Sequence, residues 1–107
     1  MLIDTNIEKI KEREIIPGYH AKIIHSENMT FVYWTIEKNK ELPEHSHVNE
    51  QVTHMLSGQF ELMIEKENKI LKSGDVVIIP PHIKHSGRSR TSCKILDVFY
   101  PIREDYK

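Results

Sequence analysis

Two histidines two residues apart, His45 and His47, are the side chains of this sequence most suited to metal chemistry. On an extended strand, residues two apart point to the same face, so both imidazoles can be directed at one point. Imidazole nitrogens bind zinc, iron, nickel and copper, and a carbonyl or carboxylate oxygen can complete a mixed site. We therefore predict a metal site to which a distant strand adds a third histidine, for which His85 is the candidate.

The segments around these histidines resemble the two metal motifs of the cupin family. Residues 43–58, PEHSHVNEQVTHMLSG, match the first motif, a His-x-His pair followed by an acidic or amide residue and a glycine. Residues 74–85, GDVVIIPPHIKH, match the second motif, with Pro80 as its proline. The resemblance implies one divalent transition metal (nickel, zinc, iron or manganese) as cofactor, with four ligands: His45, His47, Gln51 and His85.

The oxygen ligand is the least regular part of this pattern. Gln51 stands where the family usually has glutamate, and Glu50 remains an alternative ligand if the loop shifts by one residue. Three neutral imidazoles and a neutral amide would leave the full dipositive charge on the metal. Such a site favours an anionic ligand in its open positions, so we predict a small anionic substrate that carries a carboxylate.

A second group of chemically interesting residues lies near the end of the chain, in CKILDVFYPIRED. Asp97 and Phe99 share one face of a strand, and a carboxylate in an apolar interior could act as a general acid or base. Arg103 could bind a substrate carboxylate through two hydrogen bonds. The alternative is an internal ion pair between Asp97 and an arginine (Arg88, Arg90 or Arg103), with Phe99 in the core.

Residues 97–106 also resemble the end of the KdgF group of small cupins, which act in pectin degradation. The resemblance implies that Asp97, Phe99 and Arg103 are catalytic. It also implies that the reaction converts 4,5-unsaturated uronates into linear keto sugars. Three other functions remain open: an iron-type dioxygenase, a non-catalytic cupin that binds a metal or a sugar acid, and a storage-like structural cupin with a vestigial site.

Short strands separated by turns must position these residues. The pattern predicts strands at residues 19–25, 29–36, 51–56, 59–65, 69–71, 76–79 and 93–100, with a further strand from His85. Residues 76–79 are expected to be a buried strand. Residues 5–16 could form a short helix or an edge strand, and we favour irregular structure followed by a strand. The series favours an all-β sandwich or barrel, and the resemblance implies a double-stranded β-helix, or jelly roll.

Composition limits the remaining possibilities. A chain of 107 residues with 29% charged and 38% hydrophobic residues is expected to form one domain, residues 1–107. The net charge of −1 gives no support for nucleic-acid binding, and no apolar run is long enough to span a membrane. With one cysteine and no signal peptide, the sequence is typical of the cytoplasm. The resemblance implies a homodimer, for which Ile7, Ile10, Ile15 and Ile16 offer apolar surface.

Overall fold

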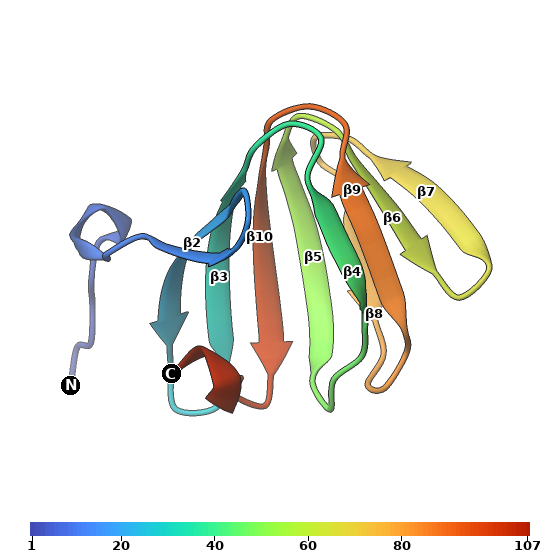
Figure 1. Ribbon diagram of the computed structural model, residues 1–107. Helices are drawn as coiled ribbons and strands as arrows, with labels where there is room; N and C mark the ends of the chain where they lie inside the picture. Colours follow the sequence, from blue (N-terminus) through green and yellow to red (C-terminus); the bar gives the residue numbers. More distant parts are fainter.

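The computed structural model describes residues 1–107, which form ten strands in two antiparallel sheets (Figure 1). The six-stranded sheet has the order β1-β2-β3-β10-β5-β8, and the four-stranded sheet has the order β4-β9-β6-β7. The strands are β1 (Arg13–Ile16), β2 (Tyr19–His25), β3 (Thr30–Ile36), β4 (Glu41–His45), β5 (Glu50–Ser57), β6 (Phe60–Ile64), β7 (Glu67–Leu71), β8 (Val76–Ile79), β9 (His85–Ser89) and β10 (Cys93–Tyr100). Two short 3-10 turns, η1 (Ile7–Lys9) and η2 (Glu104–Tyr106), lie outside the sheets.

The core lies between the two sheets and follows from the alternation of each strand. In β3 every second residue from Thr30 to Ile36 is buried, and in β10 every second residue from Cys93 to Phe99 is buried. These residues form one face, which packs against the four-stranded sheet. The buried apolar residues are Tyr19, Ala21, Val32, Trp34, Ile36, Met55, Phe60, Leu62, Leu71, Ile79, Cys93, Ile95 and Phe99. The predicted all-β jelly roll is confirmed.

Strand β8 is not buried, so the expectation for residues 76–79 is wrong. The side chains of Val76 and Ile78 are 56% and 63% exposed, and only Ile79 is buried. Strand β8 forms one edge of the six-stranded sheet, and alternate residues of a strand point to opposite faces. Ile79 therefore reaches the core, whereas Val76 and Ile78 lie on the outer face, which no second layer of the chain covers.

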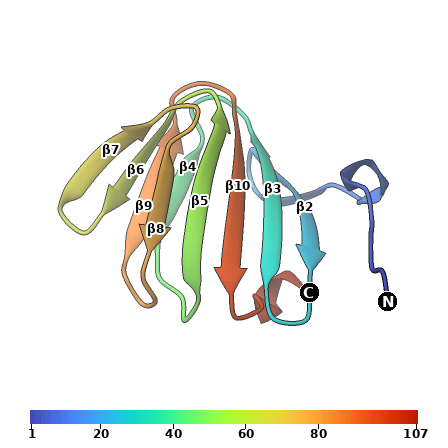
Figure 2. The ribbon, with the colours of Figure 1, turned by 180° about the vertical axis from the view of Figure 1, so that it is seen from behind.

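The N-terminal residues combine the two structures that the sequence left open. A 3-10 turn at η1 is followed by the short edge strand β1, and the residues before β1 extend away from the sheets in both views (Figure 1, Figure 2). Ile15 and Ile16 are half-buried and pack against the core, and the dimer contact expected for them and for Ile7 and Ile10 stays a prediction. No helix of the structure has the length and apolar character needed to cross a membrane.

Candidate metal centre

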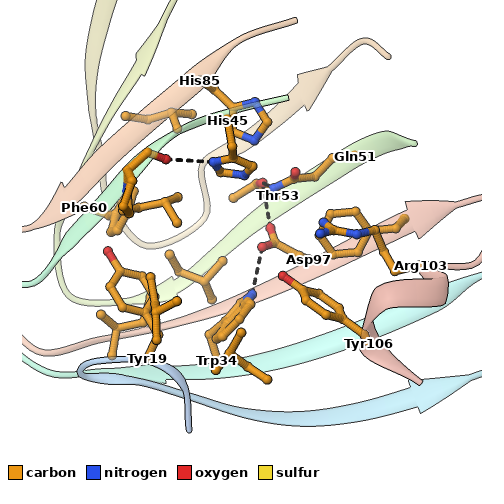
Figure 3. A pocket seen from close by; sticks show the side chains of 18 of the residues that line it. Tyr19, Trp34, His45, Gln51, Thr53, Phe60, His85, Asp97, Arg103 and Tyr106 are labelled. Atoms are coloured by element: carbon orange, nitrogen blue, oxygen red, sulfur yellow. Dashed lines mark hydrogen bonds between the residues drawn. The ribbon is translucent and has the colours of Figure 1, made fainter. Parts of the chain in front are cut away.

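His45 and His85 lie close together between the sheets (Figure 3), and His47 completes a cluster of three histidines. His45 on β4 and His85 on β9 are direct cross-strand partners, and His47 lies in the loop that follows β4. One ring nitrogen from each histidine lies within 4.8 Å of the others. Histidine nitrogens bind zinc at about 2.0–2.1 Å, so two that share one ion lie no more than about 4 Å apart. The cluster could thus bind one ion with small side-chain adjustments.

Backbone hydrogen bonds fix which nitrogen of each ring faces the cluster. The Nδ1 atoms of His45, His47 and His85 lie 2.8, 3.0 and 2.9 Å from the carbonyl oxygens of Pro43, Asn49 and Ile83. A carbonyl only accepts, so each Nδ1 must carry the proton and donate it. When such a ring is neutral, its Nε2 atom carries a lone pair that can bind a metal. This arrangement is typical of histidines that bind a metal.

His85 provides the most direct evidence that the site fits a cation. Its side chain is 2% exposed, yet its Nε2 atom has no hydrogen-bond partner. A buried polar atom without a partner is costly, on the order of 1–3 kcal/mol, and calls for an explanation. Burial also lowers the pKa of His85 to about 4, so the ring is neutral at physiological pH, as a metal ligand must be.

Gln51 reaches the same point from the opposite sheet. Its side chain is 7% exposed, and its Oε1 atom lies 3.0 Å from Nε2 of His47. Burial and the nearby Arg103 charge lower the pKa of His47, which favours its neutral form. Nε2 of His47 and Oε1 of Gln51 are then two acceptors at close range, which a shared cation would stabilise. The alternative ligand, Glu50, is exposed.

Asp97 lies beside the cluster in a network of hydrogen bonds. The Nε1 atom of Trp34 donates to its Oδ2 over 2.9 Å, and Oγ1 of Thr53 donates to its Oδ1 over 2.6 Å (Figure 3). Burial raises the pKa of Asp97 above its usual value, although both hydrogen bonds oppose this. The ion pair between Asp97 and an arginine that the sequence left open is not among the ion pairs of the structure.

Arg103 pairs instead with a neighbour in the chain. Its Nε and Nη2 atoms donate to the two carboxylate oxygens of Asp105 over 2.9 and 2.7 Å. The guanidinium carbon lies 4.8 Å from the ring centre of Phe99 and 4.2 Å from that of Tyr106. Burial works against the charge of Arg103, but the hydrogen bonds to Asp105 keep its pKa above the usual value. The arginine is therefore held at the rim with part of its hydrogen-bonding capacity still free.

Most of these groups, but not His47, line one cavity of about 320 Å³ with a polar end and an apolar end. The polar end is lined by Glu44, His45, Gln51, Thr53, His85, Asp97, Arg103 and Asp105. The rest is mostly apolar and extends past Tyr19 and Trp34 to Ile15 and Ile16 of β1. A cavity with a few convergent polar groups on an apolar wall is the usual form of a small-molecule site.

Four residues of the site were not singled out in the sequence, namely Trp34, Thr53, Asp105 and Tyr106. Spacing could have indicated two of them. Thr53 follows Gln51 by two residues on one strand, and Asp105 follows Arg103 closely enough to pair with it locally. Trp34 comes from a distant strand, and no local pattern links it to Asp97. Tyr106 ends the segment 97–106 that carries the resemblance, but no spacing rule assigns it to the site.

A second group of potential ligands, Glu14, His20 and Glu37, lies at the exposed surface of the six-stranded sheet. Nε2 of His20 is 2.7 Å from Glu37 Oε2, and this hydrogen bond raises the pKa of His20. The three residues lie on β1, on β2 and directly after β3. They therefore act as surface ion pairs that connect the ends of neighbouring strands.

Comparisons with known proteins relate the sequence and the fold of this chain to one family. A family model for the cupin domain matches residues 32–99, which include the three clustered histidines, Gln51, Asp97 and Phe99 but not Arg103. Over 96 residues the chain is 31% identical to the pectin degradation protein KdgF of Dickeya dadantii (strain 3937), covering 87% of each sequence. A crystal structure of an RmlC-like cupin from Shewanella frigidimarina NCIMB 400 superposes with a TM-score of 0.91 at 26% identity, covering 96% of this chain and 94% of that one.

A further similar structure, KdgF from Halomonas sp., superposes with a TM-score of 0.87 at 24% identity and covers 94% of each chain. At this identity the likeness supports the fold alone.

Proposed function

The chain belongs to the cupin family, and we propose that it is a metal-dependent enzyme that opens the ring of a 4,5-unsaturated uronate to give a linear keto sugar acid. The observation that carries the proposal is the placement of a buried carboxylate, Asp97, in the same cavity as a cluster of histidine nitrogens. The similarity to the pectin degradation protein KdgF supports the choice of substrate class.

The histidine cluster and Gln51 would hold the metal. A divalent ion bound there would polarise oxygen atoms of the sugar as a Lewis acid. None of the four ligands is a carboxylate or a thiolate, so none of them brings a negative charge that would offset that of the ion. An anionic sugar is therefore a better partner than a neutral one.

The chemistry requires proton transfers but no oxidant and no water. The anomeric hydroxyl loses its proton, the bond between C1 and the ring oxygen breaks, and C1 becomes an aldehyde. The ring oxygen leaves as the oxygen of an enol at C5. A proton is then added at C4 while C5 becomes a ketone, so the product is an isomer of the substrate. Asp97, whose pKa is raised by burial, is suited to carry a proton between these positions.

The residues around Asp97 would position the sugar. The guanidinium of Arg103 lies at the rim and could bind the substrate carboxylate, either beside Asp105 or in its place. Asp105 is 61% exposed at its side chain, so its displacement would require little rearrangement. Phe99 is buried at the base of this rim and, with the apolar wall, would keep water from the enol.

One observation favours a second function, a non-catalytic cupin that binds a sugar acid. Both oxygens of Asp97 already accept a hydrogen bond from the protein, as expected for a carboxylate that only stabilises the fold. In that case the protein would bind the same ligands without turnover.

A single assay tests the proposal. The protein is loaded separately with nickel, zinc, iron and manganese and mixed with 4,5-unsaturated galacturonate, and the loss of the ultraviolet absorbance of the conjugated alkene is followed. We expect at least one metal form to exceed the spontaneous rate and the metal-free protein not to do so. If no form exceeds the spontaneous rate but the sugar acid still binds, the non-catalytic function is favoured.

We also propose that the protein is a homodimer, joined through the outer face of the six-stranded sheet. One row of register-aligned residues crosses five strands of this face and is entirely apolar: Ile24, Phe31, Val98, Val52 and Ile78. Ile78 and its neighbour Val76 are the most exposed at the free edge. A second copy is the simplest partner for such a face, because a two-fold axis places the same apolar row on both sides.

Replacement of Ile78 by glutamate should therefore shift the dimer to monomer, because a charge would be buried without a partner at the interface. Light scattering during gel filtration measures the mass directly. Ile70→Glu, a matched change at another partly exposed isoleucine on β7, should leave the dimer intact. A wild-type protein of monomer mass at micromolar concentration would contradict the proposal.

A further inference from the structure

We infer that Thr53 is a positioning residue that sets which atom of the Gln51 side-chain amide faces the metal. The inference depends on the proposed metal site but not on the proposed sugar. Thr53 is 5% exposed and lines the cavity between Gln51 and Asp97 (Figure 3).

The sheet register brings these three residues together. Thr53 on β5 is directly opposite Asp97 on β10, and Gln51 is two residues from Thr53 on the same face. Side chains directly opposite each other on neighbouring antiparallel strands are close enough to interact. A threonine at this position thus contacts both Gln51, the candidate ligand on its own strand, and the buried carboxylate of Asp97.

When Asp97 is ionised, the hydrogen bonds of the network run in one direction. As a carboxylate, Asp97 only accepts, so the hydroxyl proton of Thr53 points to its Oδ1 atom over 2.6 Å. Oγ1 of Thr53 then has no proton left and can only accept from Gln51. The Gln51 atom at 2.9 Å from it must therefore be Nε2, the amide donor. The other atom of the amide, Oε1, is turned toward the histidines.

The opposite orientation of the amide would remove the oxygen ligand. It would direct two N–H groups at the metal position, and an amide NH₂ has no lone pair available to a cation. Trp34 reinforces the observed direction, because its indole N–H donates to the second oxygen of Asp97 over 2.9 Å. The indole thereby holds one oxygen of Asp97, while the other accepts the proton of Thr53.

Titration of metal-free protein with Co(II) alone tests the inference, with affinity measured by competition against a chelator and geometry by the visible absorption of the bound ion. We expect Thr53→Val, which keeps the side-chain shape but neither donates nor accepts, to weaken Co(II) binding by about 10- to 100-fold and to alter the spectrum. Thr53→Ser, which keeps the hydroxyl, should restore both. Thr35→Val, at an exposed threonine on β3, is the matched control and should have no effect.

The results separate the inference from the site on which it depends. If the wild type does not bind Co(II), the metal site itself is wrong. If the wild type binds but a folded Thr53→Val binds equally well with the same spectrum, Thr53 does not orient the ligand. If Thr53→Val does not fold, Thr53→Ser still tests the inference. This variant keeps the hydroxyl, so a tenfold loss of its Co(II) affinity would overturn the inference.

Discussion

Replacement of His85 by phenylalanine should abolish the stabilisation of the protein by a divalent metal. The change keeps a planar ring of similar size but removes both nitrogens, including the Nε2 atom that is buried without a partner. A ligand present at about 1,000 times its dissociation constant stabilises a folded protein by about 4.1 kcal/mol. The wild type should therefore melt at a clearly higher temperature with nickel or zinc than without, and the variant should melt at the same temperature in both.

The metal-free variant should remain close to the wild type in stability, because two effects oppose each other. The change removes the unpaired Nε2 atom, but it also removes the donor to the carbonyl of Ile83. His54→Phe is the matched control, since His54 is an exposed histidine on β5 and away from the cluster. A His85→Phe protein that is still stabilised by metal as strongly as the wild type would show that the ion binds elsewhere.

The strands were largely predictable because alternation reports directly which residues share a face. Residues 93–100 have the predicted bounds, since β-branched and aromatic residues are frequent there between turn residues, and a strand begins at His85 as predicted. Strand β8 shows the limit of this reasoning. A continuous apolar run is compatible with burial on both faces, but Val76 and Ile78 are exposed because the strand lies at an edge of its sheet. Strand order is a tertiary property, and a local pattern does not determine it.

The site was predictable where a known motif carries it. The spacing of His45 and His47 indicated a shared target, and the two do cluster, although His47 lies in the loop after β4 and not on the strand. The cupin motifs point to His85 and Gln51. The interactions of Asp97 depend instead on the register of three strands, which joins Trp34 and Thr53 to it across 63 and 44 residues of chain. Asp97 had several possible arginine partners in the sequence, but in the structure Arg103 pairs with Asp105, two residues further along the chain.

Asp97→Asn is the substitution that decides between an enzyme and a binding protein. If Asp97 transfers the proton during ring opening and ketonisation, the amide variant should lower kcat by about 10²- to 10⁴-fold, because an asparagine of similar shape neither gives up nor accepts a proton at neutral pH. The measurement is the loss of ultraviolet absorbance with saturating 4,5-unsaturated galacturonate. Metal is kept in excess, because the change also alters the network that holds Gln51.

A second aspartate of the same cavity provides the control. Asp105 is also a carboxylate that lines the cavity, but it is exposed at the rim and its partner is Arg103. Asp105→Asn should therefore retain kcat within a few-fold. It should chiefly change KM, because the amide no longer neutralises the charge of Arg103. If both variants turn over at the wild-type rate, Asp97 is a structural carboxylate and another group moves the proton. If only Asp97→Asn is inactive while its metal affinity at excess metal is unchanged, the buried carboxylate acts in the reaction itself.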